Sequence, residues 1–125
     1  MNVSDISIII PAFNEAATIG IVVDRIKKLY PDFEIIVIND GSGDNTAETA
    51  QQAGAIVYSH PYNIGNGAAI KSGIRIASGA VLVFMDGDGQ HDPEDIGRML
   101  EFIPDYDMVV GARAKGDQVS LLRGM

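Results

Sequence analysis

Two aspartates one residue apart end an apolar run in the segment VLVFMDGDGQHDPED, which spans Val81 to Asp95. Asp86 and Asp88 follow the run directly, and His91 stands shortly after them. Carboxylates this close repel one another unless a cation lies between them. Mg²⁺ and Mn²⁺ prefer such oxygen ligands and complete their coordination with phosphate oxygens and water. The pattern predicts a metal site formed by Asp86, Asp88 and His91 that holds a diphosphate.

Composition limits the alternatives. The chain has 125 residues, no cysteine and a formal net charge of −8, so we expect one domain over residues 1–125 without disulfides or thiolate zinc sites. The acidic balance argues against a nucleic-acid surface. An acidic protein binds a phosphate most easily through a metal or through backbone N–H groups. The sequence has no run long enough to span a bilayer and no signal-peptide pattern, so we expect a cytoplasmic protein.

Apolar runs alternate with amphipathic segments along the chain. The runs predict five strands, at Ile6–Ile10, Glu34–Ile38, Ala55–Tyr58, Ala80–Met85 and Asp107–Gly111. The segments between them predict four helices, at Ala16–Leu29, Asn45–Gln52, Gly67–Ala77 and Pro93–Phe102. Continuous apolar strands are typical of a parallel sheet buried on both faces, so we expect a three-layer α/β fold. Polar residues follow every strand, and the functional site is therefore expected at the carboxyl edge of the sheet.

Two helix starts carry recognisable signals. Asn45 with Glu48 three residues later predicts a capping box. Asp92 before Pro93 predicts an N-cap followed by the first helical residue. Asp92 is thus expected to cap a helix rather than to bind a ligand.

Several common motifs are excluded by single positions. Ile70 in GNGAAIKSG stands where a dinucleotide fingerprint or a P-loop requires glycine. Counted from Asp86, a calcium loop would need glycine where His91 stands and glutamate where Gly97 stands. Neither glycine-flanked serine has the G-x-S-x-G frame of a hydrolase. The oxygen-rich metal site is the motif that survives.

The sequence as a whole resembles the family 2 glycosyltransferases, which have the GT-A nucleotide-diphospho-sugar transferase fold, a Rossmann-like fold with a mostly parallel sheet. The resemblance is closest to the branch of dolichyl-phosphate mannosyltransferase and bacterial polyprenyl-phosphate glycosyltransferases. Five motifs carry it, in family order over nearly the whole chain: SIIIPAFNEAATI, IIVINDGSGDNT, NIGNGAAIKSGIRIASG, VFMDGDGQHDPEDI and DMVVGAR.

The resemblance implies roles at matching positions. Asp86 and Asp88 correspond to the D-x-D motif, with Asp88 as a direct metal ligand. Gln90 would lie near the donor sugar and the diphosphate, so Asp88 and Gln90 are the implied catalytic residues. Asp40 would accept hydrogen bonds from the base or the ribose. The implied nucleotide-binding set is Pro11, Ala12, Asn14, Glu15, Asp40, Gly41, Gly67, Asp86 and Arg113.

Structural interpretations stand beside these roles. Glu15 could simply favour the start of the first helix, and Asp40 could begin the Gly41–Ser42–Gly43 turn. Lys71 and Arg75, one helical turn apart, could be solvated surface residues rather than phosphate ligands.

The implied reaction is metal-dependent, inverting transfer of a sugar from a UDP- or GDP-sugar to a polyprenyl or dolichyl phosphate, or to a saccharide hydroxyl. Because relatives continue beyond the fifth strand with segments that build the acceptor site, we expect this chain to be the nucleotide-binding part of a longer protein. Membrane contact, at the cytoplasmic face, would come through that further part. We also expect Val119–Met125 to lack packing partners and the bare edge strand to promote self-association into homo-oligomers.

Three alternatives compete with this reading. A haloacid dehalogenase-like phosphatase also ends a strand in Asp-x-Asp-Gly, but there the motif lies near the domain start, and here Gln90 follows it. A sugar nucleotidyltransferase needs a glycine-rich basic N-terminal loop, where this chain has PAFNEAAT. A nucleotide-sensing or purely structural domain, or a part that binds the nucleotide sugar without transferring it, stays open.

Overall fold

The structure is a computed structural model, and it describes residues 6–87, 92–100, 108–110 and 120–122. The order of elements is β-α repeated four times, followed by two short strands. In chain order they are β1 (Ile6–Ala12), α1 (Ile19–Leu29), β2 (Glu34–Asp40), α2 (Thr46–Gln52), β3 (Ile56–His60), α3 (Asn66–Ile76), β4 (Val81–Phe84), α4 (Asp95–Leu100), β5 (Met108–Val110) and β6 (Ser120–Leu122).

The strands form one sheet in the order β3-β2-β1-β4-β5-β6. Pairing is parallel from β3 across to β5, and β6 is antiparallel to β5. The order reverses between β1 and β4, because the chain first builds outward to β3 and then crosses back. In open α/β sheets such a reversal opens a crevice at the carboxyl ends of the two central strands.

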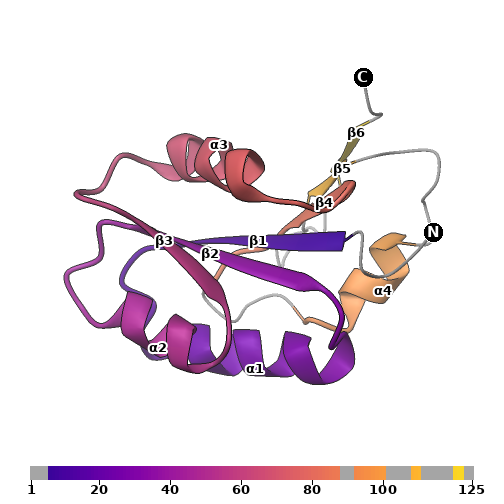
Figure 1. Cartoon of the computed structure of the whole chain (residues 1–125), viewed down its shortest axis with the longest axis horizontal. Helices are drawn as coiled ribbons and strands as arrows, with labels where there is room; N and C mark the ends of the chain where they lie inside the picture. Colours follow the sequence, from indigo (N-terminus) through magenta and orange to yellow (C-terminus); the bar gives the residue numbers. More distant parts are fainter. Residues whose placement is uncertain (1–5, 88–91, 101–107, 111–119, 123–125) are drawn as a thin grey trace.

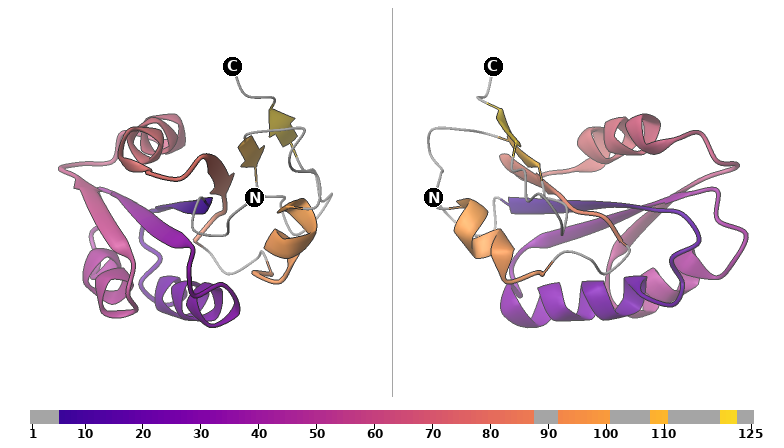
Figure 2. Two further views of the ribbon diagram at one scale, coloured as in Figure 1. Left: turned by 45° about the vertical axis from the view of Figure 1, so that its right-hand side comes forward. Right: turned by 180° about the vertical axis from the view of Figure 1, so that it is seen from behind.

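Helices cover both faces of the sheet, which confirms the predicted three-layer α/β fold. Figure 1 shows α3 on one face and α1 with α2 on the other, and Figure 2 shows α4 on the α1 side. Ile8 and Ile10 belong to the core cluster under α1, whereas Ile9 between them packs on the α3 side, and all three are fully buried. Each such side chain stabilises the fold by about 1.5–3 kcal/mol. Among the described helices, none is long and apolar enough to cross a membrane.

The first two strands run further than predicted. We expected β1 and β2 to end at Ile10 and Ile38, where polar residues begin. Parallel pairing instead continues through Pro11 with Ile38 and Ala12 with Asn39, and β2 extends to Asp40. Backbone hydrogen bonds to neighbours on both sides hold β2 extended after its apolar run has ended. Site residues that were expected in loops therefore stand on strand ends.

The expectation for the last strand was wrong. Residues 120–122, within the segment predicted to lack partners, form β6 and pair with β5. A short strand with no apolar alternation of its own gave no sequence signal, because its register comes from the partner strand. The predicted bare edge is covered, and self-association stays a prediction without that support.

The helix starts also differ from the predicted ones. Asn45 precedes α2, but its side chain makes no capping hydrogen bond. Asp44, one residue earlier, accepts the N–H of Thr46 at 3.1 Å. Asp92 does accept the N–H of Glu94 at 3.0 Å, yet α4 begins only at Asp95. Both corrections reflect local turn geometry, which places the accepting carboxylate nearer to a different N–H than the spacing rules assume.

Candidate functional site

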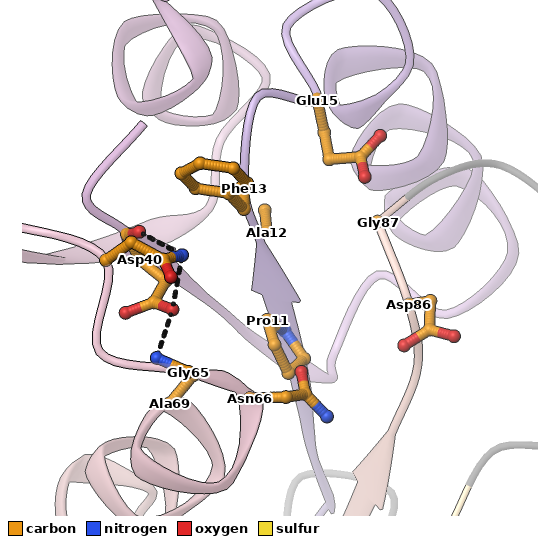
Figure 3. Close-up of a pocket in the computed structure, with 11 residues that line it drawn as sticks. Pro11, Ala12, Phe13, Glu15, Asp40, Gly65, Asn66, Ala69, Asp86 and Gly87 are labelled. Atoms are coloured by element: carbon orange, nitrogen blue, oxygen red, sulfur yellow. Dashed lines mark hydrogen bonds between the residues drawn. The ribbon is translucent and has the colours of Figure 1, made fainter. Parts of the chain in front are cut away.

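A pocket of about 300 Å³ lies at the carboxyl ends of β1 and β4, where the strand order reverses. Figure 3 shows Asp40 on one side of the end of β1 and Asp86 on the other, with Pro11 and Ala12 between them. The pocket is the crevice that the sheet topology predicts. Its lining, in the part of the chain that the structure describes, is Pro11, Ala12, Phe13, Glu15, Asp40, Asn63, Gly65, Asn66, Ala69, Asp86 and Gly87.

The predicted site residues divide into three groups. Five of them line the pocket together, namely Pro11, Ala12, Glu15, Asp40 and Asp86. Asn14, Gly41 and Gly67 are absent from its described lining, and so are Lys71 and Arg75, which are exposed on α3. Asp88, Gln90, His91 and Arg113 lie outside the described residues, so their roles stay predictions.

Asp40 is a buried carboxylate that the protein surrounds with donors. Asp40 is only 4% exposed to solvent. Its Oδ1 lies 2.7 Å from Nδ1 of His60 and accepts the N–H of Ile64 at 3.0 Å. Its Oδ2 accepts Nδ2 of Asn63 at 3.0 Å and the N–H of Gly65 at 2.8 Å. One side chain at the end of β2 therefore fixes the whole loop between β3 and α3.

The same contacts set the ionisation of Asp40. Burial by itself would raise the pKa of this carboxyl, since it disfavours the charged form. The hydrogen bond with His60 and those from the N–H groups of Ile64 and Gly65 outweigh burial, and the pKa of Asp40 is lowered from its ordinary value. The residue is thus held as a carboxylate, the form that accepts all four donors.

Gly41 lets the β3–α3 loop approach the end of β2. Its φ is +72°, a conformation that favours glycine. A Cβ at this position would lie 2.2 Å from the carbonyl carbon of Tyr62 and 2.3 Å from the backbone nitrogen of Asn63. Gly41 is therefore required by conformation and by space, and in this structure it shapes the pocket wall from behind.

The loop after β1 is braced by the loop after β2. Asn14, with φ 54°, donates its N–H to Oγ of Ser42 at 2.9 Å and accepts the N–H of Gly43 at 2.8 Å. Glu15 donates its N–H to the hydroxyl of Thr46 at 2.9 Å. These bonds account for the positions of Asn14 and Glu15 without a ligand. Asn14 holds the loop, and Glu15 lines the pocket.

The β4 side of the pocket carries Asp86. Parallel pairing is prolonged there by the N–H of Met85, which donates to the carbonyl of Ile9 at 3.0 Å. The hydroxyl of Thr18, just before α1, donates to the carbonyl of Gly87 at 2.8 Å. Asp86 is half-buried between these two anchors. The start of the D-x-D segment is therefore fixed against β1 and α1.

A metal would fit this side chemically, since Asp86 presents a hard carboxylate to the pocket. Within the described ranges, no three acidic or histidine side chains come together as a metal cluster. Asp88 and His91, the other members of the predicted set, lie outside those ranges.

Sequence reasoning missed parts of the lining. Phe13, Asn63 and Asn66 face the pocket without having been assigned to it. Phe13 lies in the motif SIIIPAFNEAATI, and Asn63 and Asn66 lie in NIGNGAAIKSGIRIASG, so the three residues stood inside recognised motifs without a role of their own. His60 was also missed, because it follows the predicted strand Ala55–Tyr58 and nothing in the local sequence indicates that the carboxylate of Asp40 lies beside it.

Comparisons with known proteins agree with this geometry. An uncharacterized protein of Methanocaldococcus jannaschii is 37% identical over 90% of this chain and 48% of its own length. The undecaprenyl-phosphate 4-deoxy-4-formamido-L-arabinose transferase of Pectobacterium atrosepticum is 31% identical over 98% of this chain and 40% of its own length. The chain thus spans about half the length of these relatives or less.

Solved structures of a glycosyltransferase also resemble this chain in part of their length. Glucosyl-3-phosphoglycerate synthase from Mycobacterium tuberculosis in complex with phosphoglyceric acid superposes with a TM-score of 0.73 at 31% identity, covering 89% of this chain and 45% of that one. The same synthase in complex with Mn²⁺, uridine diphosphate and glucosyl-3-phosphoglycerate gives a TM-score of 0.67 at 32% identity, covering 77% and 38%.

A family model described as glycosyl transferase family 2 matches residues 7–124. The match includes all the described strands apart from Ile6, and both sides of the pocket. The predicted family and its GT-A fold are therefore confirmed, and the chain belongs to glycosyl transferase family 2.

Proposed function

We propose that this chain binds the nucleotide-sugar donor of an inverting, metal-dependent glycosyltransferase, with UDP as the preferred carrier and a polyprenyl phosphate as acceptor. The observation that carries the proposal is the pocket at the strand-order reversal, with Asp86 on one side and the first turn of α3 on the other. One side offers a carboxylate that can bind a cation, and the other offers a helix N-terminus that can bind the diphosphate. An acidic protein can therefore hold an anion at this pocket.

Asp86 and Asp88 would hold Mg²⁺ or Mn²⁺. When bound, the metal supplies Lewis-acid stabilisation of the negative charge on the departing diphosphate. Solved relatives whose names include Mn²⁺ or Mg²⁺ with UDP support this choice of metal and carrier. His91 as a further ligand, and Gln90 and Arg113 near the sugar and phosphates, belong to the same proposal.

The wall opposite Asp86 supports anion binding. Helix α3 begins at Asn66, which lines the pocket, and the first amide groups of a helix have no partner within it. The positive end of the helix dipole therefore lies beside the pocket. Gly65, with φ +120° and nothing within 4 Å of a Cβ built on it, leaves room for a phosphate to approach the backbone.

Two observations support a polyprenyl phosphate as the acceptor, one from the relatives and one from the ionisable groups of the pocket. The name of the Pectobacterium relative contains undecaprenyl phosphate. A phosphate oxygen is already anionic, so its attack on the sugar needs no general base. A saccharide hydroxyl would need one. Among the described lining residues only Glu15, Asp40 and Asp86 are acids, and Asp40 is fully engaged by protein donors.

Calorimetric titration of the chain tests the donor site. UDP and GDP are titrated with and without MnCl₂, into the wild type and into Asp86→Asn. We expect Mn²⁺-dependent UDP binding that Asp86→Asn weakens at least about tenfold, since one hard ligand is lost. Asp32→Asn, at an exposed position before β2, is the matched control and should bind like the wild type.

Two results would contradict the proposal. One is nucleotide binding that is equal with and without metal, which would favour a sensing domain. The other is full affinity in Asp86→Asn. Transfer to polyprenyl phosphate is tested separately in the longer protein, by following radiolabelled sugar into the lipid phase.

A further inference from the structure

Three polar side chains line up behind the pocket, from β2 through β3 to α3. Nδ1 of His60 lies 2.7 Å from Oδ1 of Asp40, and Nε2 of His60 lies 2.8 Å from Oγ of Ser72. Since the Asp40 carboxylate only accepts hydrogen bonds, Nδ1 of His60 is the donor. His60 is 8% exposed, and neither it nor Ser72 belongs to the described pocket lining. The chain of contacts leads from Asp40 on the pocket wall away from the pocket and into the fold.

The same order of atoms occurs in hydrolase triads, but the surroundings do not support a nucleophile. Ser72 lies in the middle of α3, where backbone N–H groups are used within the helix and none is left to form an oxyanion hole. A nucleophile also needs a substrate cavity, and Ser72 does not line the described pocket. The three side chains are better explained as a support for Asp40.

The carboxylate of Asp40 has no acceptor position left for a nucleoside. A carboxylate offers about four lone-pair directions, and His60, Asn63, Ile64 and Gly65 occupy four. A base or ribose could bond to Asp40 only by displacing one of these donors. Displacing a backbone N–H would open the very loop that forms the pocket wall.

We propose that Asp40 acts on nucleotide binding as a positioning residue, and that His60 and Ser72 are the side chains that hold it in place. This inference rests on the proposed function. The Asp40 carboxylate pulls residues 63–65 toward β2, and Gly65 and Asn66 then present the start of α3 to the diphosphate. The nucleotide contacts the loop, and Asp40 contributes through the loop rather than by its own oxygens.

The chain offers a matched control at the other end of the same helix. Glu34, at the start of β2, accepts the N–H of Ser78 at 2.9 Å and its hydroxyl at 2.8 Å, and so anchors the loop after α3. Glu34 lies at the amino end of β2, opposite the pocket. A variant there loosens α3 without touching the wall that Asp40 holds.

Two variants of His60 separate its two contacts. In His60→Asn the amide nitrogen takes the place of Nδ1 and can still donate to Asp40. In His60→Gln the longer side chain places its amide near Nε2, beside Ser72, and leaves Oδ1 of Asp40 without this donor. Glu34→Gln is measured beside them. Each full chain is titrated with UDP and MnCl₂, and the amide exchange of Ile64 and Gly65 is followed by NMR without ligand.

Loss of the Asp40 contact should release the loop and weaken binding together. We expect His60→Gln to lose exchange protection at Ile64 and Gly65, because local opening exposes these amides, and to raise the Kd about tenfold, as for one hydrogen bond to a charged group. His60→Asn should stay within about threefold, since it keeps that bond. Glu34→Gln should leave the Kd within about twofold and the two amides protected.

Unchanged protection in His60→Gln would overturn the positioning role whether or not the wild type binds UDP. Equal affinity in His60→Gln and wild type despite lost protection would overturn it as well, and so would equal weakening by Glu34→Gln. A wild type that binds neither UDP nor GDP would instead overturn the proposed function, while the exchange data would still report on the anchoring of the loop.

Discussion

The two ends of β2 use the same device for different purposes. Each end carries a carboxylate that binds the loop next to α3: Glu34 holds Ser78 after the helix, and Asp40 holds Asn63, Ile64 and Gly65 before it. Glu34 is half-buried, and two of its three donors are serine hydroxyls, from Ser7 and Ser78. Asp40 is buried, and two of its four donors are backbone N–H groups.

This difference bears on the proposed role of Asp40 as a positioning residue. Hydroxyls rotate and water can replace them at a half-buried site, so the Glu34 anchor tolerates adjustment. Backbone N–H groups beside a buried carboxylate cannot rotate, and water does not replace them there. The Asp40 end is therefore the rigid one, and it is the end that faces the pocket.

Removing the carboxylate at the pocket end should have the largest effect. Asp40→Ala leaves four donors facing an apolar methyl, and we expect the free energy of unfolding to fall by about 3–5 kcal/mol. Urea denaturation followed by circular dichroism measures this loss. A loss below about 1 kcal/mol, the size of an ordinary substitution, would mean that water replaces the carboxylate and that the end is not rigid.

Gly41→Ala tests the same end without removing any hydrogen-bonding group. The added Cβ meets the backbone of Tyr62 and Asn63, and alanine at φ +72° is strained, so we expect a loss of about 2–3 kcal/mol. Gly67→Ala, where a Cβ would have nothing within 4 Å, is the matched control. Its free energy of unfolding should lie within about 1 kcal/mol of the wild-type value, because no clash arises and alanine is preferred to glycine in a helix. Equal effects in the two variants would show that space behind the pocket is not limiting.

Glu34→Gln should cost less than either change at the pocket end. The amide oxygen still accepts from Ser7 or Ser78, so we expect a loss of about 1 kcal/mol, typical of one weakened hydrogen bond. The same urea titration measures it. A loss as large as that of Asp40→Ala would remove the distinction between the two ends of β2.

The smallest effect concerns pH. Burial alone would raise the pKa of Glu34, but bonds from Ser78 and Ser7 lower it, as those from His60, Ile64 and Gly65 lower the pKa of Asp40. A carboxyl with a lowered pKa stabilises the fold above its unfolded pKa of about 4, and this contribution is lost as the pH falls through the folded pKa. The difference in stability between wild type and Asp40→Asn should therefore shrink from pH 7 to pH 3. A constant difference would show that ionisation of Asp40 adds nothing.

The sequence predicted most of the fold because its apolar runs are long and unbroken. Ile6–Ile10 and Glu34–Ile38 lie within β1 and β2, which both have a parallel neighbour on each side, and the segment around Val22 and Ile26 forms the buried face of α1. It failed where pairing or packing from elsewhere decides. Thus β6 is defined by its pairing with β5, and the N–H of Thr46 at the start of α2 is accepted by the carboxylate of Asp44 rather than by the side chain of Asn45.

For the site, the sequence by itself determined the edge, the acids and the family. Polar residues after apolar strands had to gather at one edge of a parallel sheet, and the order of the motifs indicated the family. Only the tertiary structure decided what each acid does. Asp40 and Asp86 both stand at strand ends, but Asp40 receives three donors from a loop 23 to 25 residues away in the sequence and a fourth from His60 on β3, 20 residues away. Hydrogen-bond saturation depends on which groups meet in space, and no local pattern encodes it.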